Sequence, residues 1–235
     1  MMAILSEDEE QESDPIALKE MREKVAVSMA RRHLTASKGN SEKALKQMKG
    51  AIAFRTEMNM DGIRLCYNSD LMASKLFKDD DKIQKEWNAL REGLDNQMKT
   101  PIWVVRSRDK NNRAPIFCEI RKKKDRIFHP VEYLRIHAYM LERSLACAER
   151  LSVDENVEHP IIIFTYWADF LLGDATPLSL CRKLLNMMSN CYPERLYKFY
   201  IIDAPYIFSA FWKLVKPFID PVTKQKFIFI KGEVS

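Results

Sequence analysis

The chain has 235 residues and a net charge of +5; 46% of its residues are hydrophobic and 30% are charged. This composition supports a buried core and excludes wholesale disorder, and the positive charge is smaller than a dedicated nucleic-acid-binding domain usually carries. The chain has only 6 glycines, which argues against a glycine-rich phosphate loop or a turn-rich all-β fold and favours helices.

The first part of the chain predicts a tail followed by helices. Residues 1–15 are polar and acidic, and they lack the basic flank and long apolar centre of a signal peptide. Apolar residues at helical spacing then predict helices over 16–34, over 41–58 and around 83–94. We therefore expect a disordered acidic tail at 1–15 and a helical N-terminal subdomain at 16–98.

The second predicted helix has an apolar side whose residues recur at helical spacing. These residues are Ala44, Leu45, Met48 and Ile52. We expect this side to face the core.

After Pro101 the pattern changes to strands alternating with helices. The apolar runs predict strands at 102–105, 114–118, 160–166, 199–202 and 226–230. Helices are predicted at 130–151, 176–191 and 205–216. Strand–helix–strand order is typical of an α/β layer with mostly parallel strands, so residues 99–235 are predicted to form one α/β domain behind the helical subdomain.

No catalytic or metal-binding signature is present in the sequence. It has no G-x-S-x-G elbow, phosphate loop, dinucleotide fingerprint or H-E-x-x-H pair, so we expect no enzyme activity and no metal site. The five cysteines lack a C-x-x-C pair and lie in apolar or helical contexts, which predicts reduced core thiols in a cytosolic protein.

The helix expected at 205–216 and the residues just after it are apolar on most sides. The residues responsible are Phe208, Phe211, Trp212, Val215 and Phe218. A helix that is apolar all round is either buried in the core or faces something apolar, such as lipid. The periodicity alone leaves both interpretations open.

The densest positive run is Arg121, Lys122, Lys123 and Lys124, between a predicted strand and a helix. It is either a solvated loop or a contact with an acidic membrane surface, where each basic residue contributes about 1 kcal/mol.

Residues 192–226 read YPERLYKFYIIDAPYIFSAFWKLVKPFIDPVTKQK. This stretch resembles the lipid-binding segment of the CRAL-TRIO family, in particular its phosphatidylinositol/phosphatidylcholine transfer proteins. The segments 32–45 and 113–117 are similar to the family's N-terminal helical module and β-hairpin, so the resemblance covers roughly residues 16–230.

The resemblance implies a hydrophobic pocket that is floored by the sheet and gated by the helix at 205–216. It also implies a phospholipid headgroup site formed by Glu194, Thr223, Lys226 and Lys38. If the buried carboxylate and ammonium have no ligand, we expect Glu194 and Lys226 to contact each other, because a buried charge requires a partner.

Two positions depart from the family pattern. Ser37 stands where inositol-lipid-binding members have an arginine, which removes one phosphate contact. The Ser/Thr pair that binds choline in dual-ligand members corresponds to Phe164 and Tyr166 here, which argues against phosphatidylcholine in the same mode.

Taken with the resemblance, the sequence predicts a lipid-binding and lipid-transfer protein. It would hold one phospholipid, most closely phosphatidylinositol, without a cofactor and as a monomer. The protein would be cytoplasmic and peripherally membrane-associated, and would not bind nucleic acid. Two alternatives stay open: a lipid-sensing interaction module that transfers nothing but regulates a partner, and a carrier of a non-phospholipid such as a sterol, tocopherol or retinoid.

Overall fold

The computed structural model describes residues 15–68, 80–99, 102–120, 129–149, 159–168 and 170–232. The predicted tail, apart from Pro15, lies outside the described residues. The basic run Arg121–Lys124 lies outside them as well.

Helices come first in the chain, as predicted. They are α2 (Pro15–Ala36), α3 (Ser41–Glu57), α4 (Met60–Leu65) and α6 (Asp81–Met98). Side chains cap several of them: the amide oxygen of Asn40 accepts a hydrogen bond from the backbone N–H of Lys43 and so starts α3. None of the described helices combines the length and the apolar character needed to cross a membrane.

A five-stranded sheet follows, in the spatial order β1-β2-β3-β4-β5. Its strands are β1 (Ile102–Val105), β2 (Ala114–Glu119), β3 (Ile161–Tyr166), β4 (Leu196–Ile202) and β5 (Phe227–Ile230). The β1–β2 pair is antiparallel and the other three pairs are parallel, which confirms the predicted α/β class with a mostly parallel sheet.

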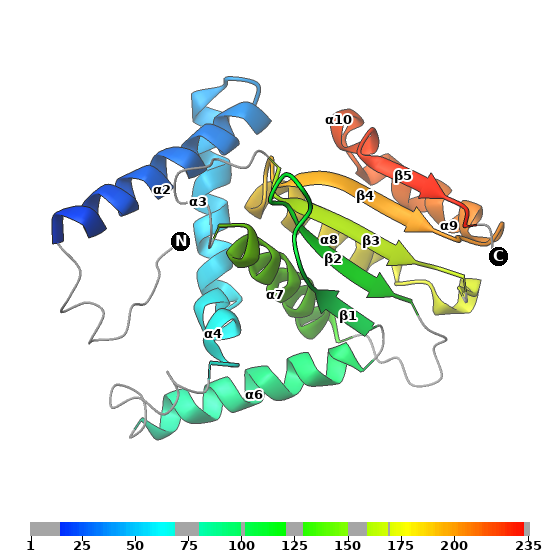
Figure 1. The fold of residues 1–235 in the computed structure, drawn as a ribbon, viewed down its shortest axis with the longest axis horizontal. Coiled ribbons are helices and arrows are strands. Elements are labelled where there is room, and N and C mark those ends of the chain that lie inside the picture. The colour runs from blue at the N-terminus through cyan, green and yellow to red at the C-terminus, as the bar shows by residue number, and fades with distance from the viewer. Residues whose placement is uncertain are drawn as a thin grey trace.

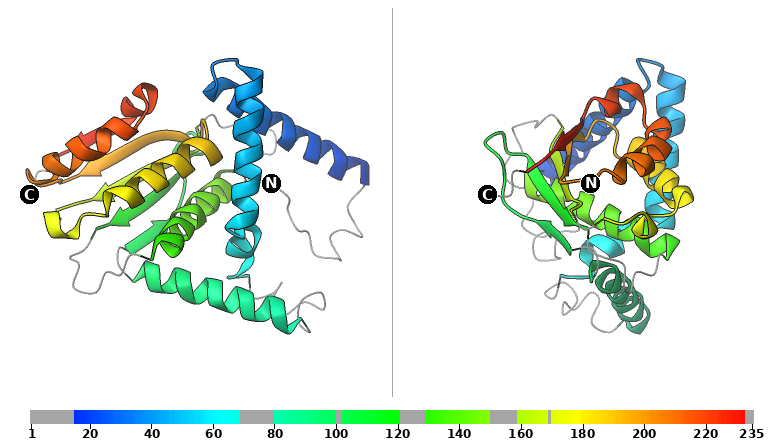
Figure 2. Two further views of the ribbon diagram at one scale, coloured as in Figure 1. Left: turned by 180° about the vertical axis from the view of Figure 1, so that it is seen from behind. Right: turned by 90° about the vertical axis from the view of Figure 1, so that its right-hand side faces the viewer.

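The helices that connect the parallel strands cover one face of the sheet (Figures 1 and 2). They are α7 (Pro130–Glu149), α8 (Leu178–Cys191) and α9 (Phe208–Val215). Short turns complete the layer: η1 (Leu172–Asp174), η2 (Lys216–Phe218) and α10 (Pro221–Lys224). Successive crossovers move across the sheet in one direction and share one hand, so their helices lie on the same side.

The prediction for the core-facing side of α3 is only partly right. Ala44 is buried as expected, and so is Ala51, but Leu45 is 48% exposed and Ile52 is 52% exposed. The buried face is therefore centred on the two alanines, and Leu45 and Ile52 turn outward.

The opposite face of the sheet carries one apolar side chain from every strand at the same level. Paired in register across the five strands, these are Val104, Phe117, Phe164, Tyr200 and Ile228. The three aromatic rings stack, with centroids 5.0 and 4.7 Å apart. Cross-strand aromatic pairs of this kind stabilise a sheet.

Candidate functional site

A cavity of about 730 Å³ lies between the helix-covered face of the sheet and helices α7, α8 and α9. Its volume is within the range of about 300–1,000 Å³ that is typical of small-molecule sites. Its walls are mainly aliphatic and aromatic side chains, with polar groups concentrated near the amino ends of the parallel strands.

The four predicted headgroup residues all line this cavity, although they come from distant parts of the chain. They are Lys38, Glu194, Thr223 and Lys226, and together they define what we call the polar end. Backbone hydrogen bonds hold two of these segments at the amino ends of strands: Ile161 donates to the Arg195 carbonyl at 3.0 Å, and Phe199 donates to the Lys226 carbonyl at 2.8 Å.

Lys226 is a half-buried cation at the polar end. Its ammonium donates to the Leu196 carbonyl at 2.7 Å. Burial lowers the pKa of the Lys226 ammonium below its usual value, although the Glu194 and Asp220 carboxylates oppose that shift. No ion pair within 4.0 Å joins Lys226 to Glu194 among the described residues, so the expected direct contact is replaced by the carbonyl bond.

Glu194 occupies the turn between α8 and β4 with a left-handed backbone, φ 56°. Its carbonyl accepts a hydrogen bond from His159 Nδ1 at 2.8 Å, and its carboxylate lies 3.7 Å from the same nitrogen. Because Nδ1 carries this proton, the histidine fixes the turn and orients the carboxylate beside the cavity.

Asp220 places Thr223 by capping α10. One carboxylate oxygen accepts from the backbone N–H groups of Val222 at 3.0 Å and Thr223 at 2.9 Å. Burial acts to raise the pKa of the Asp220 carboxyl, but the hydrogen bonds from Thr223 and Val222 outweigh it and hold the pKa below its usual range. The cap therefore stays ionised at neutral pH and sets the turn that carries Thr223.

Lys38 lies two residues after the end of α2 and also has a left-handed backbone, φ 52°. It is exposed and lies at the rim of the cavity. Its neighbour Ser37, which stands at the family's arginine position, is buried and does not line the cavity. Gln47 holds this region against α8, since its side-chain amide donates to the Ser189 carbonyl at 3.1 Å.

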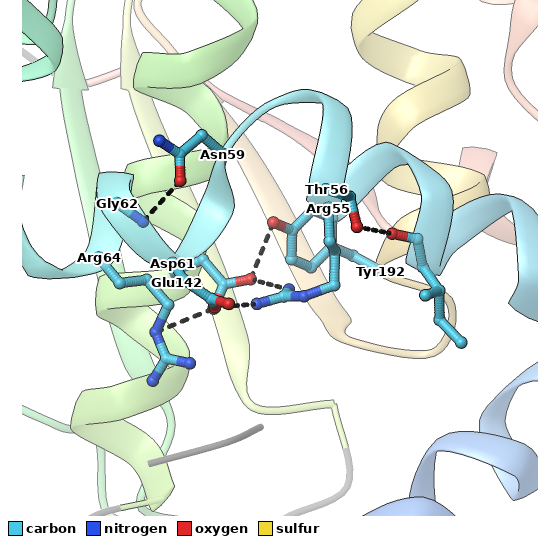
Figure 3. Close-up of polar contacts among 9 residues, drawn as sticks. Arg55, Thr56, Asn59, Asp61, Gly62, Arg64, Glu142 and Tyr192 are labelled. Carbon is cyan, nitrogen blue, oxygen red and sulfur yellow. Dashed lines mark hydrogen bonds and ion pairs between the residues drawn. The ribbon is translucent and has the colours of Figure 1, made fainter. Parts of the chain in front are cut away.

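A buried ion cluster fixes the turn that carries Glu194 to the N-terminal helices (Figure 3). At its centre is Glu142 of α7, only 8% exposed. One of its carboxylate oxygens accepts from Arg55 Nη1 at 2.7 Å and from the Tyr192 hydroxyl at 3.0 Å. The other lies 3.5 Å from Arg64 Nε. Tyr192 precedes Glu194 by two residues, so this cluster ties the polar end to α3 and α4.

The other end of the cavity, which we call the aromatic end, is closed by rings at the carboxyl ends of the strands. Trp167, after β3, packs on Phe208 at 4.7 Å between ring centroids, and Phe170 packs on Phe208 at 5.5 Å. Helix α9 starts here and runs along the cavity toward the polar end. All five predicted gate residues line the cavity, namely Phe208, Phe211, Trp212, Val215 and Phe218.

The two residues matched to the family's choline-binding pair lie on the face of the sheet that points away from the cavity. Phe164 and Tyr166 border a separate groove on the opposite side. Because side chains alternate along a strand, β3 turns Ile161, Ile163 and Thr165 toward the main cavity. The Thr165 hydroxyl already donates to the Tyr200 carbonyl at 3.0 Å.

Three contributors to the site were missed by the reasoning from the sequence: His159, Asp220 and Glu142. A local signal existed for Asp220, since Asp followed by Pro221 is typical of a helix start. For His159 and Glu142 no local signal existed, because their partners lie 35 and 50 residues away. Among the described residues, no group of His, Cys, Asp and Glu side chains could hold a metal ion.

A known family matches the part of the chain that forms the sheet. The CRAL/TRIO domain matches residues 98–235, more than half of the chain. The chain therefore belongs to the CRAL/TRIO family of lipid-binding domains, which confirms the resemblance.

Individual relatives are similar over different lengths. The phosphatidylinositol transfer protein PDR17 of Saccharomyces cerevisiae is 28% identical over 205 residues, covering 84% of this chain and 50% of PDR17. The SEC14 cytosolic factor of Eremothecium gossypii is 55% identical over 58 residues, 25% of this chain and 18% of that protein. The crystal structure of Sfh5 superimposes with a TM-score of 0.62 at 15% identity, covering 88% of this chain and 65% of Sfh5. The matches thus span half or less of the length of PDR17 and of the SEC14 cytosolic factor. At 15% identity, the likeness to Sfh5 shows the fold alone.

Proposed function

We propose that the chain holds one phospholipid, most closely phosphatidylinositol, in this cavity and exchanges it at membranes. The observation that carries the proposal is convergence: Lys38 and eight residues of the stretch 192–226, which were predicted as headgroup and gate residues, all line the same cavity. The names of relatives such as PDR17 add support for this lipid class.

The polar end offers the chemistry that an inositol phospholipid requires. The ammonium groups of Lys226 and Lys38 are suited to the phosphodiester, because charge-assisted hydrogen bonds to phosphate are strong. The Thr223 hydroxyl can donate to a phosphate oxygen, and the Glu194 carboxylate can accept from inositol hydroxyls. Binding phosphate would also give the half-buried Lys226 ammonium an anionic partner.

The apolar part of the cavity suits the acyl chains. A diacyl lipid has about 30 methylenes, each worth about 0.8 kcal/mol when removed from water, so about 25 kcal/mol would oppose extraction into water. A lining of aliphatic and aromatic side chains replaces the bilayer interior with a similar environment. Exchange at a membrane further requires that the gate helix α9 moves.

Native mass spectrometry after incubation with mixed-lipid vesicles would test the proposal. We expect a one-to-one adduct at the mass of phosphatidylinositol. An adduct of phosphatidylcholine or a sterol instead would contradict the headgroup assignment, and a folded protein with no adduct would contradict the lipid pocket.

The headgroup residues are tested by the double variant Glu194→Gln/Lys226→Ala. It should lose at least 10-fold in phosphatidylinositol loading while keeping the far-UV circular dichroism of the parent, because the headgroup contacts are lost but the sheet is not. Lys224→Ala is the control. It removes a cation from the same segment as Lys226, but the Lys224 side chain does not line the cavity. Unchanged loading in the double variant would refute the site.

A liposome-to-liposome transfer assay separates the two remaining interpretations. Transfer above background supports exchange, while loading without transfer would favour a lipid-sensing interaction module. Contact between the basic run Arg121–Lys124 and an acidic membrane stays a prediction, because that run is outside the described residues.

A further inference from the structure

Positive charge is concentrated in the hairpin formed by α2 and α3. Between Lys19 and Glu57 the sequence has ten Lys and Arg residues against four Asp and Glu residues, a net charge of +6. Since the full chain has a net charge of +5, everything outside this hairpin sums to −1. The charge is therefore a local property of one structural unit.

Several basic residues of the hairpin are exposed near the turn between α2 and α3, which is the tip of the hairpin (the turn itself is seen in Figure 1). These residues are Arg31, Lys38, Lys43, Lys46 and Lys49. Thr35, Ala36 and Lys38 line the cavity itself, and α10 lines it with them. No ion pair within 4.0 Å joins any of the five basic residues to a carboxylate in the described part of the chain.

Exposed aliphatic side chains lie among these charges. Leu34 is 41% exposed on α2, and the outward-facing Leu45 and Ile52 lie on α3 beside Lys46 and Lys49. Across the cavity mouth, Val222 of α10 is 60% exposed. This mixture suits a lipid surface, which binds cations at its headgroups and aliphatic groups at the headgroup boundary.

We propose that the tip of the α2–α3 hairpin docks on an anionic lipid bilayer, so that the polar end of the cavity faces the headgroup layer. This surface differs from the basic run at 121–124 and from the gate helix. The inference rests on the proposed function only for the identity of the lipid exchanged; the docking itself depends on the charge and exposure of the hairpin.

The test compares sedimentation with vesicles of phosphatidylcholine alone and with 30% phosphatidylserine. The full chain should bind the anionic vesicles and lose binding as salt rises, because exposed charges are screened. In the variant Lys43→Ala/Lys46→Ala/Lys49→Ala, affinity should fall about 100-fold, since each basic residue near such a surface contributes about a fivefold factor. Alanine favours helix, so α3 should persist.

The control variant is Lys82→Ala/Lys85→Ala/Lys99→Ala, which removes the same charge from the α6 region; none of these three lysines lines the cavity. It should bind within about threefold of the parent. Equal losses in both variants, no loss in the hairpin variant, or displacement from vesicles by stoichiometric duplex DNA would overturn the proposal.

Loading from detergent micelles separates this inference from the proposed function. The hairpin variant should take up phosphatidylinositol from micelles as the parent does, because docking is not needed there. If it loses micelle loading as well as vesicle binding, the lysines act in the pocket and the docking role is refuted. If the parent takes up no lipid from micelles but binds anionic vesicles through the hairpin, the docking proposal stands and the proposed function fails.

Discussion

The polar end of the cavity is bordered by turns and short caps, whereas the aromatic end is closed by packed rings. At the polar end a few hydrogen bonds position each segment: the Asp220 carboxylate accepts two from the backbone of α10, and His159 and Lys226 each donate one to a backbone carbonyl. At the aromatic end, Phe208 alone contacts the rings of five other aromatic residues. The two ends lie roughly 20 Å apart, the length of a six-residue strand.

This difference indicates a division of roles between the ends. Packing of large apolar groups contributes most of the stability of a fold, while hydrogen-bonded turns contribute little each but set the positions of polar groups. Substitutions at the aromatic end should therefore act mainly on unfolding, and substitutions at the polar end mainly on the ligand.

The largest effect is expected for Phe208→Ala at the aromatic end. Removing this buried ring should lower the free energy of unfolding by about 3–5 kcal/mol, because a cavity is left among its neighbours. Urea denaturation would measure it. Phe218→Ala is the matched comparison and should cost less, since Phe218 is only half-buried and lies against the Arg182 guanidinium. Equal losses would remove the distinction between the two ends of the cavity.

A smaller effect is expected for Asp220→Ala at the polar end. Loss of the α10 cap should lower the free energy of unfolding by about 1 kcal/mol. Because the pKa of Asp220 is lowered in the folded state, its ionic contribution is present above the usual value of 3.8 and is lost as pH falls through the lowered pKa. In Asp220→Asn, the free energy of unfolding measured by urea titration should depend less on pH in the acid range. The same slope of this free energy against pH below pH 4 in parent and variant would contradict the prediction.

The smallest effect on stability is expected for Lys226→Met, and it should be confined to alkaline pH. Since the pKa of Lys226 is lowered by burial, the unfolded chain binds more protons between that lowered pKa and 10.5. The free energy of unfolding of the parent should therefore rise with pH across this window, relative to the variant. Urea denaturation between pH 7 and 10.5 would measure this. If the free energy of unfolding changes with pH equally in the parent and in Lys226→Met, Lys226 is not desolvated.

Much of the fold was predictable because its signals are local. The strand at 160–166 was predicted from a continuous apolar run and is β3, and the predicted helix at 176–191 is α8 with a start two residues later. The face of α3 was partly mispredicted because hydropathy ranks leucine and isoleucine above alanine. The structure buries Ala44 and Ala51 instead.

The site was predictable only through the resemblance. Nothing in the local sequence around Glu194 or Lys226 distinguishes them from surface charges. Their approach to one cavity depends on the crossovers of the sheet, and the Glu142 cluster that holds the turn depends on contacts between segments 50 and 87 residues apart. The choline-pair correspondence placed Phe164 and Tyr166 at the pocket, and the alternation of β3 shows that they face away from it.

The left-handed backbones of Lys38 and Glu194 have a consequence for engineering. A non-glycine residue in this region costs of order 1 kcal/mol or more, and glycine would adopt it without strain. A search for more stable variants would thus select glycine at both positions and remove one cation and one carboxylate from the polar end. In this chain, thermostability screened without a lipid readout would select against the proposed headgroup site.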